Sequence, residues 1–146
     1  MRISRASTYA LYGLSYLAGQ GNGRRVPLSE IHVNHGVPRK HLAKIFRFLV
    51  RAGILSASRG VNGGFSLARD PRKVTLLDVV QIIDGPLRED GCLMSKTPCE
   101  DASQCLVNSL WQRAQGAMLD VLGKATLADV AGGVPPRARG GRKKMR

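Results

Sequence analysis

Acidic residues are scarce in this sequence. Its 146 residues include ten Asp and Glu against 23 Lys and Arg, which gives a formal net charge of +13 at pH 7. A protein this basic usually meets a polyanion, either a nucleic acid or an anionic membrane surface. Hydrophobic residues make up 43% of the chain, enough for one real core, which excludes wholesale disorder.

Long apolar runs and catalytic motifs are missing as well. No stretch reaches the roughly 20 apolar residues that a membrane-spanning helix needs, and polar residues interrupt the segment after MRISR too often for a signal peptide. We therefore expect a cytoplasmic protein with no membrane partner. There is no HExxH motif, phosphate-binding glycine loop, nucleophile–base pair or carboxylate dyad, so we expect no enzyme.

The excess positive charge lies in two segments. Residues 1–60 hold ten basic residues (Lys and Arg) and one acidic residue, for a net charge of +9. Residues 61–133 hold seven basic and nine acidic residues (−2), and residues 134–146 hold six basic and no acidic residues (+6). The end of the chain, VPPRARGGRKKMR, has no apolar periodicity, so we predict a basic disordered tail over residues 133–146. Composition leaves open whether this tail binds phosphates or is only solvated.

Two short helices joined by a glycine are predicted between residues 27 and 53. The first covers residues 27–35, Gly36 breaks it, and Pro38 starts the second, which Gly53 ends. In the second helix, apolar and basic residues lie on opposite faces. The apolar residues are Leu42, Ile45, Phe46, Leu49 and Val50, and the basic ones are Lys40, Lys44, Arg47 and Arg51. Such a pair, preceded by a helix over residues 4–18, is typical of a helix-turn-helix.

The second helix would enter the major groove of double-stranded DNA. Its N-terminal residues Arg39, Lys40 and His41 would reach base edges. Arg39 is suited to bidentate binding of guanine, and Lys44 and Arg47 are suited to holding phosphates. The alternative is that this charged face is only solvated.

A β-hairpin directly follows this helix. Residues 54–58 and 65–68 read as strands, and the glycine-rich turn RGVNGG joins them. In this position the hairpin is a wing, and Arg59 at its base is placed to enter a narrow minor groove. With a further helix over residues 74–84, the sequence predicts a mainly α fold with a small β-hairpin wing: a winged helix-turn-helix over residues 1–85.

Three cysteines, Cys92, Cys99 and Cys105, lie in a loop over residues 86–105 with the spacing C-x6-C-x5-C. An odd count argues against a closed set of disulfides, and a zinc site usually has a C-x2-C pair and a fourth ligand nearby. Three thiolates suit a soft metal centre, for which an iron–sulfur cluster is the natural candidate. The spacing also leaves zinc, redox-active thiols and plain loop cysteines open.

A late helix carries a long apolar stripe. Its members are Val107, Leu110, Trp111, Ala114, Met118, Val121 and Leu122. A chain of this size leaves the helix little else to pack on, so we predict a long dimerisation helix followed by a short terminal helix over residues 106–132. A homodimer would match a palindromic operator, whereas the alternative is core packing within one subunit.

Together these features resemble the Rrf-type winged-helix transcriptional regulators, which include the IscR-like and NsrR-like iron–sulfur regulators. The resemblance rests on MRISRASTYAL, RGVNGGFSLARDP, VTLLDVVQIIDG, the three cysteines and CLVNSLW, and it covers about residues 1–132. It implies a homodimeric bacterial transcription factor whose cluster gates DNA binding. It also implies that Cys92, Cys99 and Cys105 are the cluster ligands.

The sequence departs from both subgroups at the fourth ligand. IscR-like members have a histidine where this chain has Asn108, and NsrR-like members take an aspartate from the partner's first helix where this chain has Thr8. Neither Asn nor Thr is a good iron ligand. The fourth ligand is therefore unassigned, with Asp90, Glu100, Asp101, a partner residue, water or a small thiol as candidates. The gap between the first two cysteines is one residue longer than in IscR-like members, which leaves both a 2Fe–2S and a 4Fe–4S cluster open.

We thus predict an iron–sulfur-dependent, sequence-specific DNA-binding repressor that senses redox state, nitric oxide or iron status. One alternative is a cluster-free repressor whose cysteine thiols respond directly to oxidation. A further alternative is a basic scaffold that binds nucleic acid without sequence preference.

Overall fold

The computed structural model describes residues 3–21, 23–87, 92 and 103–133. Its elements are α1 (Arg5–Gly19), α2 (Leu28–His35), α3 (Arg39–Arg51), β1 (Leu55–Ser58), β2 (Gly64–Leu67), the 3-10 helix η1 (Pro71–Lys73), α4 (Leu76–Asp84) and α5 (Leu106–Lys124). The predicted mainly α fold with a hairpin wing is confirmed, and the predicted boundaries lie within two residues of these bounds. No helix in the described part of the chain is long and apolar enough to cross a bilayer.

Side-chain and glycine caps set the helix ends. The hydroxyl of Ser4 accepts the N–H of Ser7 at 3.1 Å and so starts α1. Thr75 and Asp78 form a reciprocal capping box at the start of α4. Gly36 ends α2 with a φ of +63°, which turns the chain into α3. Pro38 is the N-cap of α3 and not its first residue, because its ψ of 128° is not helical, although its carbonyl already accepts the N–H of Leu42 at 3.0 Å.

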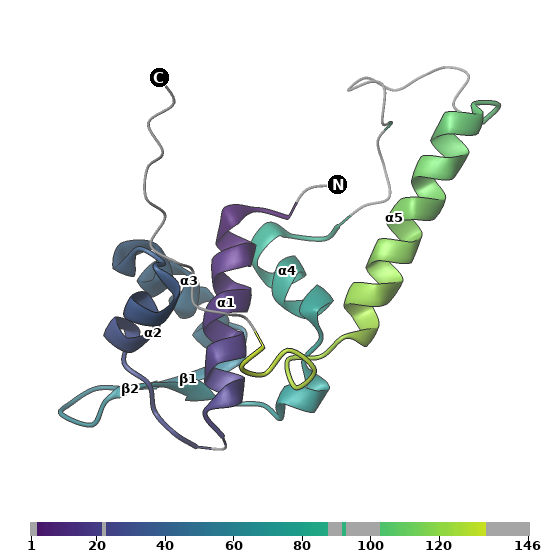
Figure 1. Ribbon diagram of the computed structural model, residues 1–146. Helices are drawn as coiled ribbons and strands as arrows, with labels where there is room; N and C mark the ends of the chain where they lie inside the picture. The colour runs from purple at the N-terminus through teal and green to yellow at the C-terminus, as the bar shows by residue number, and fades with distance from the viewer. Residues whose placement is uncertain (1–2, 22, 88–91, 93–102, 134–146) are drawn as a thin grey trace, which may run out of the picture.

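The core lies between α1 and the elements around it. In Figure 1, α2 and α3 lie on one side of α1, and α4 lies on the other. Phe46 of α3 is fully buried, and its ring meets the edge of Phe65 of β2 with centroids 5.0 Å apart. A Cβ on Gly13 of α1 would lie 2.7 Å from Phe46 Cζ, so this glycine allows the close approach of α1 and α3.

The wing is attached to the chain that leads into α2. Its strands pair in antiparallel register from Leu55 opposite Leu67 to Ser58 opposite Gly64. Val26 pairs with the outer side of β2 through an isolated antiparallel bridge to Phe65. The Val26 N–H donates to the Phe65 carbonyl at 2.8 Å, and the Phe65 N–H donates to the Val26 carbonyl at 2.9 Å. A Cβ on Gly64 would lie 2.7 Å from the Val26 carbonyl oxygen, so this approach requires a glycine. The sequence did not predict this pairing.

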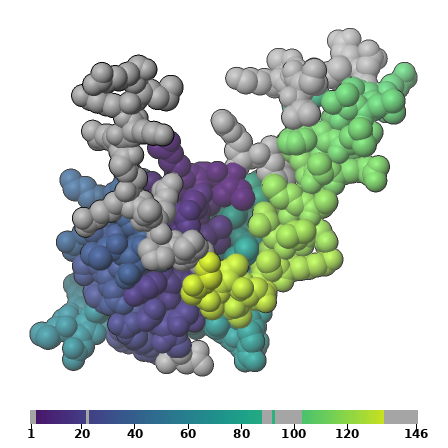
Figure 2. Space-filling view, viewed as in Figure 1, coloured from purple at the N-terminus to yellow at the C-terminus, as the bar shows by residue number. Residues whose placement is uncertain are grey.

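The chain beyond the wing differs from the prediction at one place. α5 extends away from the rest of the molecule (Figures 1 and 2). The short terminal helix predicted after it is wrong: Thr126 forms an isolated bridge with Thr75, and residues 127–133 form successive turns. The N–H groups that a helix would use point elsewhere, because Leu127 donates to the Val74 carbonyl and Gly132 donates to the Ser15 carbonyl.

His35 predicts a pH dependence of stability. Its ring is buried at the end of α2, stacks on Tyr12 and meets the edge of Tyr16, and neither ring nitrogen has a hydrogen-bond partner among the described residues. Burial lowers the pKa of His35, because it disfavours the charged ring. The unfolded chain therefore binds this proton more readily than the folded chain, so acidification below the ordinary histidine pKa of ~6.5 costs stability.

We expect the free energy of unfolding to fall as the pH drops from about 7.5 to 5.5, with a slope of at most ~1.4 kcal/mol per pH unit from this group. In His35→Phe this loss should shrink, whereas the exposed-site control His41→Phe should keep it. Urea unfolding curves across that range measure both. A His35→Phe curve as pH-dependent as the wild type would contradict the assignment.

Candidate nucleic-acid interface and metal centre

The two faces of α3 separate as the sequence predicted. Leu42, Ile45, Phe46 and Leu49 are buried in the core. The five predicted DNA-contacting residues of this helix, Arg39, Lys40, His41, Lys44 and Arg47, are all exposed. Burial of the apolar face fixes the rotation of the helix, and that rotation presents the basic residues to solvent.

The basic side chains of this face are available to a ligand. Among the described residues, none of Arg39, Lys40, Lys44 and Arg47 forms an ion pair with a carboxylate. By contrast, Arg24, near the start of α2, pairs with Glu30 at 3.1 Å. The Tyr16 hydroxyl also donates to Glu30 at 2.6 Å, and this hydrogen bond raises the pKa of Tyr16. Within the described part of the chain, no carboxylate therefore neutralises these four cations of α3.

Arg59 is carried by the same packed unit as α3. It is exposed just after β1, where the turn begins that the Gly63 N–H closes by donating to the Gly60 carbonyl at 2.9 Å. The contact between Phe46 and Phe65 joins the wing to the underside of α3. α3 and the wing are thus fixed relative to one another, which a ligand that contacts both would require.

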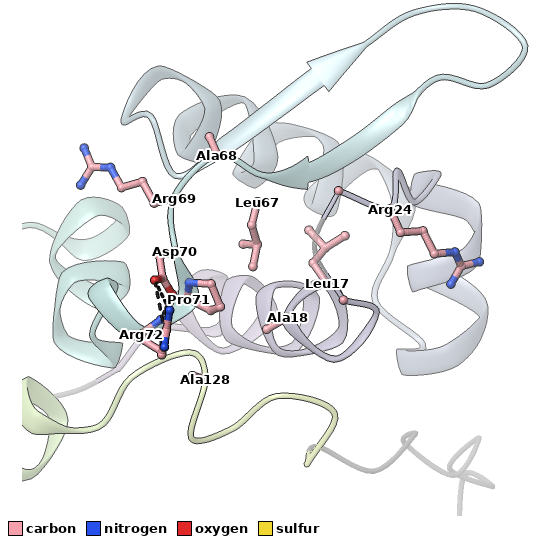
Figure 3. A pocket seen from close by; sticks show the side chains of 12 residues that line it. Leu17, Ala18, Arg24, Leu67, Ala68, Arg69, Asp70, Pro71, Arg72 and Ala128 are labelled. Carbon is pink, nitrogen blue, oxygen red and sulfur yellow. Dashed lines mark hydrogen bonds and ion pairs between the residues drawn. The ribbon is translucent and has the colours of Figure 1, made fainter.

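A hollow of about 510 Å³ lies near the end of β2, but its charged residues do not converge on it. In Figure 3, Arg24 and Arg69 extend away from it, and Leu17 and Leu67 line its interior. Arg72 pairs with Asp70 at 2.9 Å, and these hydrogen bonds lower the pKa of Asp70. The exposed face of α3 is therefore the better candidate for an anionic partner.

The cysteine loop lies mostly outside the described residues. Cys99 falls there, as do Asp90, Glu100 and Asp101. Cys92 and Cys105 are described and are half-buried. Within the described ranges, which do not include Cys99, no group of three or more His, Cys, Asp or Glu could hold a metal.

The structure places Cys105 at the N-cap of α5, where its carbonyl accepts the N–H of Ser109 at 3.1 Å. Asn108 lies one turn further on and is buried. The hydroxyl of Thr8 donates to the Ser4 carbonyl of its own helix at 3.0 Å. Thiolate sulfur suits iron, and the partial positive charge of a helix N-terminus stabilises an anionic group there. Among the described residues, the thiols of Cys92 and Cys105 therefore suit an iron–sulfur cluster by their chemistry, whereas Asn108 and Thr8 do not.

The start of the cysteine loop is fixed to α1. Asp84 ends α4 and accepts the Ser4 N–H at 3.0 Å and the Ser4 hydroxyl at 2.5 Å. Partial burial opposes ionisation of Asp84, but the hydrogen bonds from Ser4 outweigh it and lower the pKa of this carboxyl. This contact was not predicted, because the two residues lie 80 positions apart in the sequence.

α5 buries polar residues and exposes apolar ones. Asn108 and Gln115 are its buried residues, and α5 packs against α4. On another side, Val107 is 42% exposed, Leu110 60% and Val121 63%. With the exposed Ala114 and Ala117, these residues recur at spacings of three and four, which is the pattern of a helix that packs on another helix. We call them the apolar stripe of α5.

Comparison with known proteins gives a consistent picture. The profile of the Rrf2 family, described as iron-dependent transcriptional regulators, matches residues 3–133. A protein of Aquifex aeolicus, provisionally named as a helix-turn-helix transcriptional regulator, is 31% identical over 132 residues, which cover 89% of this chain and 91% of the other.

Two solved structures share the fold. CymR, the global cysteine regulator of B. subtilis, has a TM-score of 0.76 at 25% identity and covers 92% of this chain and 98% of its own. IscR of T. potens has a TM-score of 0.67 at 25% identity, and the match covers 88% of this chain and 85% of the IscR chain.

Proposed function

Because the chain belongs to the Rrf2 family, whose members are DNA-binding transcriptional regulators and not enzymes, we propose that it is an iron–sulfur-dependent, sequence-specific repressor. It binds a palindromic operator as a homodimer in the cytoplasm. Its signal is redox state, nitric oxide or iron status. Residues 1–85 read DNA, residues 86–105 carry the sensor, and residues 106–132 carry the dimer contact.

The observation that carries DNA binding is the face of α3 with unneutralised cations. Arg39, Lys40 and His41 lie in its first turn, where a recognition helix meets base edges in the major groove. Lys44 and Arg47 follow on the same exposed side, in position to hold phosphates. Arg59 extends the contact to the minor groove beside it.

Support for a homodimer comes from the apolar stripe of α5. A helix of 19 residues is about 28 Å long, so a second copy of α5 can cover the stripe along its whole length. The exposed leucine and valines would be costly to leave in water at ~25 cal/mol per Å² of apolar surface. Two-fold symmetry of the dimer would place the two α3 helices on the two halves of a palindrome.

We assign Cys92, Cys99 and Cys105 as cluster ligands, and the fourth ligand stays open. When bound, a cluster supplies a centre that reacts with oxidants and nitric oxide. The chain's own residues connect this site to both functional parts, because Cys105 begins α5 and Asp84 holds the start of the loop on α1. A change in the loop therefore acts on the dimer helix and on the DNA-reading half together.

Spectroscopy on protein purified without oxygen tests the cluster. We expect visible absorption, with iron and acid-labile sulfide, in the wild type and their loss in Cys105→Ala, which should remain a folded dimer. Ser103→Ala, an exposed neighbour, is the matched control and should keep the absorption. A colourless, iron-free wild type that still binds its operator would contradict the cluster.

Base reading predicts a specific effect of Arg39→Ala. Loss of a bidentate contact to guanine should cost ~1–3 kcal/mol on the preferred operator and relax specificity at one or two base pairs. Lys44→Ala should instead weaken binding equally on all sequences and lower the slope of log K against log salt by about one. Binding to matched and scrambled duplexes at several salt concentrations separates the two. An Arg39→Ala loss that is the same on every duplex would make Arg39 a phosphate contact.

A cluster-free thiol sensor is the second candidate. It is favoured by the structural similarity to a protein named as a global cysteine regulator. In that case, the half-buried thiols of Cys92 and Cys105 respond to oxidation directly. The same anaerobic preparation decides, since an iron-free dimer whose DNA affinity changes reversibly on thiol oxidation supports this reading.

A further inference from the structure

The chain that follows α5 returns to the DNA-reading half. Residues 125–132, which we call the C-terminal segment, run from the end of α5 past η1 and along the end of α1 (Figures 1 and 3). Leu127 from this segment is fully buried in the core of that half. α5 itself packs on α4, so the C-terminal segment is a second attachment of the dimer helix to the body.

Its first contacts are with η1, with the residue that follows η1 and with the start of α4. The Leu76 N–H donates to the Ala125 carbonyl at 2.9 Å, and the Leu127 N–H donates to the Val74 carbonyl at 2.9 Å. The Ala128 N–H then donates to the Pro71 carbonyl at 3.2 Å. Backbone bonds hold this part, so its position does not depend on flexible side chains.

Its last contacts are with α1. The Gly132 N–H donates to the Ser15 carbonyl at 3.0 Å, and the buried Ser15 hydroxyl donates to the Val130 carbonyl. The approach is close, because a Cβ on Gly19 would lie 2.8 Å from the Gly132 nitrogen. Only a residue without a side chain at position 19 permits it.

The turn between these contacts is held by its own side chains. The Asp129 carboxylate accepts the Thr126 N–H at 2.7 Å and the Thr126 hydroxyl at 2.8 Å. These bonds lower the pKa of Asp129, so it is ionised and keeps the turn closed at neutral pH. A segment bonded at both ends and closed in the middle transmits a fixed geometry.

From these contacts we propose that the C-terminal segment fixes the angle between α5 and the DNA-reading half, and so sets the half-site spacing that the dimer accepts. Ser15 and Gly19 are then positioning residues for operator specificity, although neither belongs to the recognition face. This inference rests on the proposed function. In the proposed dimer, α5 of one subunit holds the partner subunit. Any rotation of α5 relative to α1 would therefore change the distance between the two α3 helices.

Gly19→Ala is the direct test, because alanine favours the helix but its Cβ would displace the backbone at Gly132. Gly123→Ala in α5 is the matched control, since its Cβ would meet only the Leu77 side chain at an ordinary 3.5 Å. Ser15→Ala is a milder second variant that keeps α1 intact and removes one hydrogen bond to the segment. The probes are the duplex that wild-type protein selects from a random-sequence library, and versions with the half-sites one or two base pairs closer or further apart.

We expect the wild type and Gly123→Ala to prefer the selected spacing by at least about tenfold, and both test variants to reduce that preference to about threefold or less while remaining dimers. Binding to an isolated half-site should not change, which a general loss of folding would not allow. If the wild type is monomeric or selects no two-fold sequence, the proposed function fails. If it selects a palindrome and both variants keep the wild-type spacing preference, this inference alone is overturned.

Discussion

Leu110→Glu should convert the proposed homodimer into monomers. Leu110 lies in the middle of the apolar stripe of α5 and is 60% exposed in the single chain, so the change leaves the fold of one subunit intact. In a two-fold interface each substitution occurs twice, which would bury two unpaired carboxylates near each other. An uncompensated buried charge typically costs ~3–5 kcal/mol, enough to dissociate a helix-mediated dimer.

DNA binding should fall with the dimer. A dimer binds its second half-site intramolecularly, and linking two sites in this way raises the apparent affinity by ~10²–10⁴. Leu110→Glu should lose most of that factor on a palindrome and little on an isolated half-site. Sedimentation of the protein and titration of both duplexes measure the two effects.

Gln112→Glu is the control, because it places the same carboxylate on an exposed position of α5 away from the apolar stripe. It should remain a dimer with near wild-type affinity. A dimeric Leu110→Glu would mean that another surface holds the two chains together.

The regular elements were predictable because each repeats one chemical signal. On α3, apolar and basic residues alternate with helical period, and burial of Phe46 or Leu49 follows from that pattern alone. The wing was predictable from its glycine turn. The basic face of α3 was predictable from the same periodicity, and Arg39 and Lys44 are exposed as expected.

The connections were not predictable, because they depend on backbone groups that carry no sequence signal. Val26 stands between Arg25 and Pro27 without alternation, yet it pairs with Phe65. The C-terminal segment was predicted to be helical, but the N–H groups of Leu127, Ala128 and Gly132 bond to carbonyls far away in the sequence. Likewise, periodicity could list the apolar residues of α5 but could not say which of them α4 covers.

Phe46→Ala should cost more stability than other truncations to alanine in the core, because Phe46 is the largest fully buried side chain. Phe46 is fully buried where α1, α3 and the wing meet, against Gly13 on one side and Phe65 on the other. Truncation of a core phenylalanine typically costs ~3–5 kcal/mol, and its edge-on aromatic contact adds to that cost. Domains of this kind are stable by only ~5–15 kcal/mol, so a large part of the total would be lost.

Phe48→Ala provides the matched control, since Phe48 lies two residues away on the same helix and is 46% exposed. The same truncation there removes less buried surface and should cost no more than about 1 kcal/mol. Urea unfolding of both variants, compared at equal m-values, measures the difference. Equal losses at the two positions would contradict the core that joins α3 to the wing, and with it the geometry on which the proposed joint DNA contact of Arg39 and Arg59 rests.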